Sequence, residues 1–343
     1  MQTKKSKQVN LLLIFVSLQI YIISMKNLEK YFSSLTDDKN PINLYQPIGY
    51  ILQQGGKRVR PKLVEISTQI FGGDIEKAIY PAASFEMLHN FTLIHDDIMD
   101  LAPLRRGKET VYKKWNNNIA ILSGDALATM ALQQILLTPV ASDLILKMAS
   151  LFAQTSLEIC EGQQYDLDFE TMDQVSIDQY IEMIRLKTAV MLAGCLKVGA
   201  ILSETSESNQ NEIYNFGIHV GLAFQLQDDL FDVYSDAETF GKQIGGDIKS
   251  NKKTFLYLLA LEKANETQKD ELIKWFSSET INFDEKFRSV KSIFDQLNIK
   301  TETENRIHYY VNQALNNVEN LTVSAEMKTV LIDYAQQLAQ RIK

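Results

Sequence analysis

Two short clusters of aspartates have the residue types and the spacing of a metal site. One ends residues 95–100 (HDDIMD) and the other ends residues 224–232 (FQLQDDLFD), and each reads Asp-Asp-x-x-Asp. The six carboxylates are those of Asp96, Asp97, Asp100, Asp228, Asp229 and Asp232. On a helix, residues i and i+4 lie one above the other and residue i+1 lies beside them, so each cluster puts three carboxylates on one face. A solvated acidic helix end explains one such cluster, but both follow apolar helical runs, where uncompensated charge is costly.

Carboxylate oxygens without histidine or cysteine partners suit Mg²⁺, which keeps several waters and binds through carboxylates and substrate phosphates. About three Mg²⁺ ions would balance the six carboxylates. Such a site still needs an anion and basic ligands to receive it. We therefore expect the substrate to be a diphosphate.

Two compact basic segments supply those ligands in an otherwise acidic chain. They are residues 55–61 (GGKRVRP) and residues 103–108 (PLRRGK), the second only a few residues after the first aspartate cluster. Arginine forks bind phosphate through paired hydrogen bonds, so these segments suit a second anion pocket that needs no metal. Basic residues near helix ends also commonly complement the helix dipole, which remains the alternative for either segment alone.

Two further positions have a possible role at such a site. His89 lies two helical turns before Asp96 on nearly the same face, so a buried core histidine and a diphosphate ligand are both open interpretations. Lys187 and Thr188 lie in the middle of a predicted helix. A threonine there can hydrogen-bond back to the preceding turn and bend the helix, which would free a carbonyl to face a cationic intermediate.

The apolar pattern that positions these residues is helical from residue 27 onward. Residues 176–179 (SIDQ) form a capping box that opens a helix over residues 180–194. Helices are also predicted over residues 82–100 and 213–233, and both are apolar on most sides, so they should lie inside a bundle. No strand-like alternation is evident. We predict a single all-α domain over residues 25–343, with about ten or more helices.

Composition excludes some classes of protein. The net charge is −8, so the chain lacks the positive surface of a general nucleic-acid binder. The two cysteines stand in no metal or redox motif, which indicates reduced, buried thiols in a cytoplasmic protein. Residues 1–24 carry three lysines before an apolar run. An accessory or untranslated extension before Met25, a membrane-proximal anchor and an export signal all remain open, so membrane contact is uncertain.

Taken together, these motifs resemble the trans-polyprenyl (isoprenyl) diphosphate synthases. The matching segments are GGKRVRP (55–61), HDDIMD (95–100), RRG (105–107), KTA (187–189), FQLQDDLFD (224–232), GK (241–242) and KKT (252–254). The resemblance implies an all-helical isoprenoid-synthase bundle around a central cavity, usually a homodimer. It also implies head-to-tail condensation of isopentenyl diphosphate with an allylic diphosphate, assisted by Mg²⁺.

The resemblance further implies roles for individual residues. Asp96, Asp97 and Asp100 would hold Mg²⁺ from one wall, and Asp228, Asp229 and Asp232 from the other, with Asp228 the most direct ligand there. The isopentenyl diphosphate ligands would be Lys57, Arg60, His89 and Arg106. The allylic diphosphate ligands would be Arg105, Lys187, Lys242 and Lys252, while Thr188 and Gln225 would face the carbocation. Asn251 replaces the usual glycine before Lys252, which makes the geometry of that loop less certain.

Product length depends on the residues just before the first cluster. Phe91 lies five residues before Asp96 and Thr92 four before it. Phe91 can be read as an ordinary core aromatic; in the resembling family a bulky fifth residue forms the floor of the product cavity. One aromatic there resembles the geranylgeranyl type, with the farnesyl type as the alternative. A terpene cyclase and a non-catalytic partner subunit are more remote, because all six aspartates and the GGKRVRP segment are present.

Overall fold

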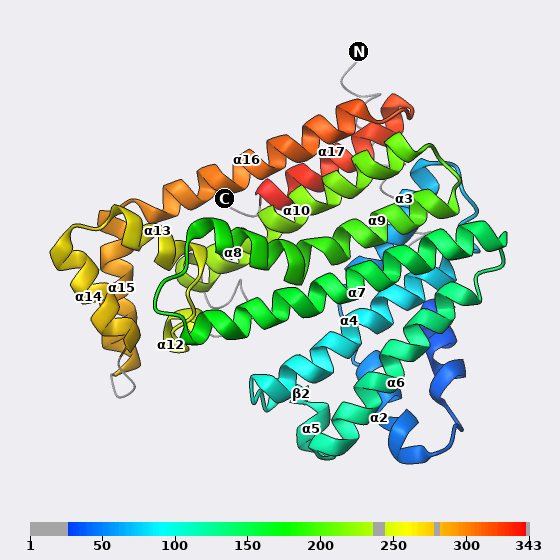
Figure 1. Ribbon diagram of the computed structural model, residues 1–343, viewed down its shortest axis with the longest axis horizontal. Coiled ribbons are helices and arrows are strands. Elements are labelled where there is room, and N and C mark those ends of the chain that lie inside the picture. Colours follow the sequence, from blue (N-terminus) through cyan, green and yellow to red (C-terminus); the bar gives the residue numbers. More distant parts are fainter. Residues whose placement is uncertain (1–26, 236–243, 278–281, 341–343) are drawn as a thin grey trace, which may run out of the picture. The chain divides into compact units, whose positions relative to one another are not determined.

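The computed structural model describes residues 27–235, 244–277 and 282–340, and these are helical apart from loops and one hairpin (Figure 1). Residues 27–36 are helical. The further elements are α2 (Ile42–Leu52), α3 (Val59–Ile70), α4 (Ile79–Met99), β1 (Leu104–Arg105), β2 (Lys108–Glu109), α5 (Val111–Lys114), α6 (Asn117–Leu136), α7 (Ser142–Thr171), α8 (Ile177–Ile184), η1 (Arg185–Ala189), α9 (Val190–Leu202), α10 (Glu207–Tyr234), α12 (Gly246–Lys249), α13 (Phe255–Lys263), α14 (Glu266–Ser277), α15 (Phe283–Gln296), α16 (Ile299–Asn320) and α17 (Ala325–Gln340). The all-α prediction is confirmed, and the hairpin is the one departure from it among these residues.

The described residues belong to two compact units. The first unit is Met1–Phe152 with Val198–Glu204, and the second is Ala153–Lys197 with Thr205–Lys343. Two of the divisions between them fall inside α7 and α9, and the third falls between α9 and α10. Residues 1–24, with their open interpretations, lie outside the described residues.

Helix α4 is the central element of the first unit, because it packs against α2, α3, α5 and α6. Phe85, Met87 and Leu88 are fully buried on it, as expected for a helix that is apolar on most sides. Pro81 stands in the first turn, where its missing N–H costs nothing. The helix runs from Ile79 to Met99 and therefore begins slightly earlier than the sequence predicted.

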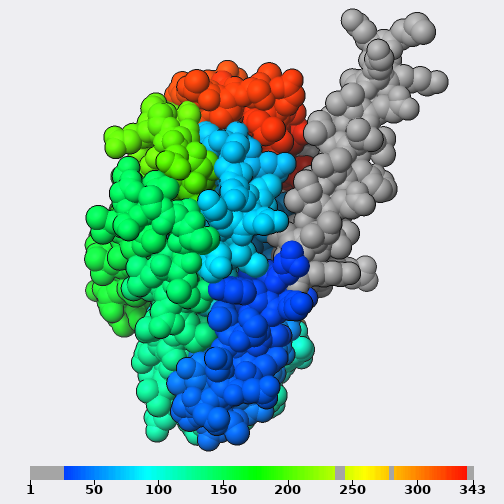
Figure 2. All heavy atoms as spheres, turned by 90° about the vertical axis from the view of Figure 1, so that its right-hand side faces the viewer, coloured from blue at the N-terminus to red at the C-terminus, as the bar shows by residue number. Residues whose placement is uncertain are grey.

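Helix α6 is the one described helix that is long and apolar enough to cross a membrane, judged by length and composition. Core helices have the same character, and α6 packs against α2 and α4 in the first unit. The helical residues at the start of the described chain also contact it, since the Tyr31 hydroxyl donates to Gln134 at 2.5 Å. In Figure 2 these residues, in blue, border green residues of the α6 region.

In the second unit, α10 packs against α8, η1, α13, α16 and α17, and it runs side by side with α16 (Figure 1). Two glycines on α10 allow close contact with its neighbours. A Cβ on Gly221 would lie 2.5 Å from the Cα of Ala189, and one on Gly217 would lie 2.5 Å from the Cα of Ala193. The predicted helix over 213–233 is confirmed, but it extends further at its N-terminal end.

The predicted capping box is present, since Ser176 accepts from the Gln179 N–H and the Gln179 side chain accepts from the Ser176 N–H. The helix that it opens does not continue regularly to residue 194. It passes through the π-helical turn η1, which contains Lys187 and Thr188. The Thr188 hydroxyl donates to Gln225 Oε1 at 3.2 Å, so the expected back-bond to the preceding turn was wrong. The helix is interrupted at the expected place by a π-turn instead.

The two cysteines differ in burial. Cys195 is buried, whereas Cys160 is exposed, so the prediction of two buried thiols is confirmed for one of them only.

Candidate active site

The first aspartate cluster ends α4, and its middle residue is neutralised by an arginine. Asp97 is 1% exposed, and Arg105 Nε donates to its two carboxylate oxygens at 2.9 and 3.0 Å. Arg105 Nη2 lies 2.7 Å from Asp97 Oδ1. Burial raises the pKa of Asp97, and the hydrogen bond and charge of Arg105 act against that rise. Asp96 is half-buried, and Asp100 is exposed at the C-terminal end of the helix.

Arg105 and Arg106 are held by the β1–β2 hairpin. Leu104 pairs with Glu109 and Arg105 with Lys108, which leaves Arg106 and Gly107 as a two-residue turn. Both turn residues have positive φ, 53° and 74°, as a type I′ turn requires. Such a turn points successive arginines in different directions. Arg105 reaches Asp97, whereas Arg106 Nη1 donates to the carbonyl of Gly55.

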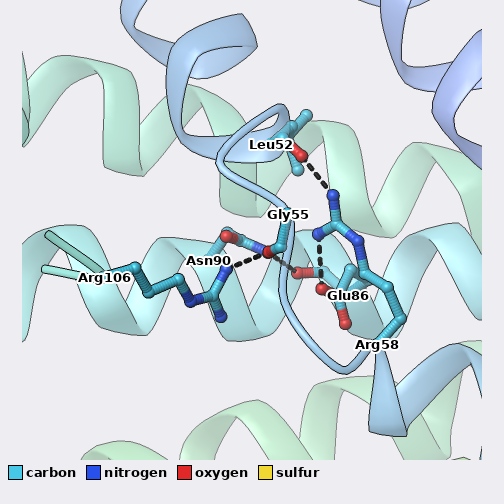
Figure 3. A network of polar contacts seen from close by, with 6 residues as sticks. All are labelled: Leu52, Gly55, Arg58, Glu86, Asn90 and Arg106. Carbon is cyan, nitrogen blue, oxygen red and sulfur yellow. Dashed lines mark hydrogen bonds and ion pairs between the residues drawn. The ribbon is translucent and has the colours of Figure 1, made fainter. Parts of the chain in front are cut away.

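Figure 3 shows how the loop before α3 is tied to α4. Arg58 Nη1 lies 2.7 Å from Glu86 Oε1, and both side chains are almost completely buried. Arg58 Nη2 also donates to the Leu52 carbonyl at the end of α2. The Arg58 backbone is left-handed, with φ of 46°. Arg58 therefore anchors the loop, while its neighbour Lys57 is exposed.

Four arginines surround His89 closely enough to affect its pKa. Burial, followed by the charges of Arg60, Arg106, Arg105 and Arg58, lowers the pKa of His89 well below its usual value. His89 is therefore neutral at pH 7 and can donate or accept a hydrogen bond without adding charge. The structure thus brings three of the predicted isopentenyl diphosphate ligands, Arg60, His89 and Arg106, into one basic cluster of the first unit.

Phe91 is half-buried on α4, and its ring meets the ring of His95 edge-on, with the centroids 4.8 Å apart. The neighbouring Thr92 hydroxyl donates to the His89 carbonyl at 2.8 Å. Within the first unit, Phe91 therefore belongs to the same end of α4 as the aspartate cluster.

The second aspartate cluster, on α10, has a different arrangement. Asp229 is 4% exposed; Tyr180 donates its hydroxyl to Asp229 Oδ2, and Gln225 Nε2 donates to Oδ1 at 3.1 Å. Burial raises the pKa of Asp229 to about 8, and the charge of Asp247 contributes in the same direction. Asp229 is therefore largely protonated at pH 7.

The last residue of this cluster caps the next helix. Asp232 accepts from the backbone N–H of Gly246 at 3.1 Å and of Asp247 at 3.0 Å, one bond to each carboxylate oxygen. It is 8% exposed, whereas Asp228 is half-buried. The three aspartates of one motif thus have three different environments.

A pocket of about 110 Å³ lies in the second unit beside Asp229. The predicted residues that line it are Lys187, Thr188, Gln225, Asp229 and Lys252. The ammonium of Lys187 lies 2.5 Å from Asp166 Oδ2. A Cβ on Gly162 would lie 2.3 Å from the backbone nitrogen of Lys187, so only glycine lets α7 approach the π-turn this closely.

Sequence reasoning missed Tyr180 and Asp166, which also line this pocket. They are 49 and 21 residues from their partners Asp229 and Lys187, and no local pattern links such positions. Lys242 is the one predicted ligand that lies outside the described residues.

A larger groove of about 650 Å³ lies in the first unit, next to Tyr50, Lys114 and Trp115. None of the predicted site residues lines it. The groove is therefore not the candidate active site, although it is larger than the pocket beside Asp229.

The donor set decides which metal the clusters suit. Among the described residues, no three histidine, cysteine or acidic side chains gather around one point as a closed metal site would require. Asp96 in the last turn of α4 and Asp100 at its C-cap lie one turn apart and offer only carboxylate oxygens. These residues fit Mg²⁺, which takes its remaining ligands from water and substrate phosphates.

Comparisons with known proteins agree with this chemistry. The sequence matches the polyprenyl synthetase family over residues 41–295. A geranylgeranyl pyrophosphate synthase of Geoglobus acetivorans is 34% identical over 316 residues, which cover 92% of this chain and 96% of that protein. A geranylfarnesyl diphosphate synthase of Aeropyrum pernix is 30% identical over 318 residues, covering 91% and 97%.

The fold gives the same result. A crystal structure of a geranylgeranyl pyrophosphate synthase matches with a TM-score of 0.88 and 43% sequence identity, covering 92% of this chain and 97% of that one. Since the family match spans most of the chain and these relatives match along almost their whole length, the chain belongs to the polyprenyl synthetase family and is a prenyltransferase.

Proposed function

We propose that the protein condenses isopentenyl diphosphate head-to-tail with an allylic diphosphate and releases geranylgeranyl diphosphate. The pocket of the second unit carries the proposal, because it joins Lys187 and Lys252 to the paired side chains of Thr188 and Gln225. Two ammonium groups suit an allylic diphosphate, and polar oxygens suit the carbocation left when that diphosphate departs.

The basic cluster of the first unit supports a site for isopentenyl diphosphate. Arg60, His89 and Arg106 present donors to an anion, and His89 stays neutral because burial, followed by the nearby arginine charges, lowers its pKa. Lys57 is exposed, lies close to Arg60 in the sequence and completes the proposed set of isopentenyl diphosphate ligands. An anion bound there would lower the electrostatic cost of holding several guanidinium groups together.

Each aspartate has its own proposed role. Asp96 and Asp100 in the first unit, and Asp228 in the second, would hold Mg²⁺, which would supply Lewis-acid stabilisation of a leaving diphosphate. Asp97 fixes the position of the Arg105 guanidinium. Asp229 acts through its bonds to Tyr180 and Gln225, and Asp232 fixes the start of α12 and contributes less to the metal than the sequence predicted.

The remaining steps depend on exclusion of water and on removal of one proton. Asp229 is largely protonated. The other carboxylates that line the pocket, those of Asp166, Glu170 and Asp247, are weak bases, and Asp166 is paired with Lys187. We therefore expect the departed diphosphate to take the proton. Apolar residues such as Met183 and Ile184 also line the pocket and help to keep water from the cation.

Incubation of the purified protein with Mg²⁺, isopentenyl diphosphate and each short allylic diphosphate, followed by sizing of the products, tests this function. A twenty-carbon product is expected. A fifteen-carbon product would make the protein a farnesyl type, and a twenty-five-carbon product would match the geranylfarnesyl relative. Consumption of the allylic diphosphate without isopentenyl diphosphate would indicate a cyclase. No turnover without an added protein would indicate a partner subunit.

Phe91 is the proposed floor of the product cavity. Replacing it with alanine removes the ring that meets His95 and should lengthen the product by one or more five-carbon units. Phe91→Tyr keeps the ring and is the matched control, with an unchanged product. Unchanged chain length in Phe91→Ala would make Phe91 an ordinary core aromatic.

We also propose a homodimer in which residues 25–343 act as one catalytic domain, since the family match runs through both units. The first unit exposes large apolar side chains on α6, at its C-cap and at the start of α7, namely Ile121, Leu122, Leu136, Leu137 and Leu146. Such a surface is typical of a subunit interface. Sedimentation of the protein and of Leu122→Glu should show a dimer and a monomer respectively.

Location in the cytoplasm is proposed as well. Fractionation of cells expressing the full chain, and a chain that begins at Met25, would show whether residues 1–24 bring the protein to a membrane.

A further inference from the structure

The segment between α12 and α13 holds a residue in an unusual conformation beside the pocket. Asn251 has a φ of 58°, in the left-handed region that asparagine tolerates better than most residues other than glycine. It lines the pocket together with Lys252 and Lys253. Asn251 stands where the resembling family usually has glycine, and the structure shows that the asparagine adopts the left-handed conformation there.

A buried lysine holds the Asn251 side chain. Lys286 on α15 is 4% exposed, and its ammonium donates to Asn251 Oδ1. The same ammonium lies 5.0 Å from the centre of the Phe276 ring. Burial lowers the pKa of Lys286. A buried ammonium needs hydrogen-bond partners, so the Asn251 carbonyl is important to its placement.

The rest of the segment is also fixed. Gly245 has a φ of 76°, and a Cβ there would lie 2.6 Å from the Phe287 ring on α15. On the far side of Lys252, Lys253 Nζ donates to the Phe169 carbonyl at 2.6 Å and to the Met172 carbonyl. Lys252 is thus flanked by two anchored residues.

We propose that Asn251 and Lys286 form a positioning pair that sets the backbone at Lys252, so that this lysine meets the allylic diphosphate. The pair also places the positive charge of Lys286 behind Asn251, which lines the pocket and accepts its hydrogen bond. The inference depends on the proposed function only for the identity of the ligand, since any diphosphate would be sensitive to both effects.

Two single variants distinguish the effect of the Asn251–Lys286 hydrogen bond from that of the left-handed backbone at Asn251. Asn251→Gly keeps the left-handed backbone accessible but removes the carbonyl acceptor. Lys286→Met removes the ammonium but keeps an apolar chain of similar length against Phe276. Each should raise KM for the allylic diphosphate about 5- to 10-fold, with KM for isopentenyl diphosphate unchanged. The double variant should be no worse than the more affected single variant, because both remove one interaction.

Matched controls exist in the same unit. Asn298 also has a positive φ, 55°, but does not line the pocket, so Asn298→Gly should leave both KM values unchanged. Lys291 lies on the same helix as Lys286 and pairs with Asp295 at the surface, so Lys291→Met should also have no effect. Thermal unfolding of all variants distinguishes general damage from local misplacement.

Binding of inorganic pyrophosphate, measured by calorimetry with and without Mg²⁺, separates this inference from the proposed function. Weaker binding in Asn251→Gly and Lys286→Met, 5- to 10-fold, supports the pair even if the wild-type protein makes no prenyl product. Normal product formation with unchanged pyrophosphate binding and unchanged KM in both variants would overturn the pair and leave the function intact. Parallel increases in both KM values with a lower Tm would also overturn it.

Discussion

The middle aspartates of the two Asp-Asp-x-x-Asp clusters are both buried, but their surroundings neutralise them differently. Asp97 receives a charged fork from Arg105, whereas Asp229 receives hydrogen bonds from the neutral groups of Tyr180 and Gln225. Burial and the charge of Asp247 raise the pKa of Asp229 to about 8 against the effect of these two hydrogen bonds, while Arg105 opposes the rise at Asp97. Two copies of one motif can therefore carry different charges at the same pH.

The contrast extends to the regions around the clusters. Near α4, the buried Glu86 is likewise paired with an arginine, Arg58. Near α10, Asp232 is satisfied by two backbone N–H groups instead. The buried acids Asp97 and Glu86 of the first region depend on arginine partners, whereas Asp229 and Asp232 of the second depend on neutral hydrogen-bond donors. The substitutions below should therefore affect the two regions unequally.

The largest effect is expected at the first aspartate of each cluster. Asp96→Ala and Asp228→Ala should each reduce turnover by about 10²- to 10⁴-fold, because metal-assisted departure of the diphosphate is worth several kcal/mol. Steady-state assays at saturating Mg²⁺ measure this, with circular dichroism to show an intact fold. Near-normal turnover in either variant would remove that cluster from the metal site.

The second effect concerns stability in the α4 region. Glu86→Ala leaves Arg58 buried without its partner and should lower the free energy of unfolding by about 3–5 kcal/mol. The exposed pair of Lys263 and Glu302 is the control, and Glu302→Ala should cost less than about 1 kcal/mol. Urea unfolding of the two variants compares them directly. Equal costs would show that the buried pair is not required.

The third effect compares the middle aspartates. Asp97→Asn should cost about 1–3 kcal/mol at pH 7, since Arg105 loses its charged partner. Asp229→Asn should cost less than about 1 kcal/mol, because an amide resembles the protonated carboxyl already present. Both are measured by urea unfolding in metal-free buffer. A larger loss in Asp229→Asn would mean that Asp229 is ionised.

The last effect, the smallest per unit of pH, is a pH dependence that belongs to Asp229. Its pKa rises from 3.8 to about 8 on folding, so the folded state holds the proton more tightly. Its contribution to stability is therefore complete below pH 3.8 and is lost as the pH rises through about 8. Relative to Asp229→Asn in metal-free buffer, the wild type should lose stability across this range, by at most about 1.4 kcal/mol per pH unit. Parallel curves for the two proteins would contradict the shifted pKa.

Much of the helical structure and the position of the aspartate clusters can be predicted from the local sequence. Spacing within one or two helical turns predicts the capping box at Ser176 and Gln179 and the buried helix that carries Phe85. It also predicts that the aspartate clusters lie at helix ends. Patterns of this kind depend on neighbours in the chain, and the helical fold and the chemical class depend on them too.

Local patterns could not separate residues that look alike in the chain. Lys57 and Arg58 are adjacent basic residues, yet one is exposed and the other is buried against Glu86, 28 residues away. Tyr180 and Asp166 were missed for the same reason, since their partners are distant in sequence. The charge of a buried group depends on its dielectric surroundings and its nearest donors, and folding alone brings those donors to Asp97 and Asp229.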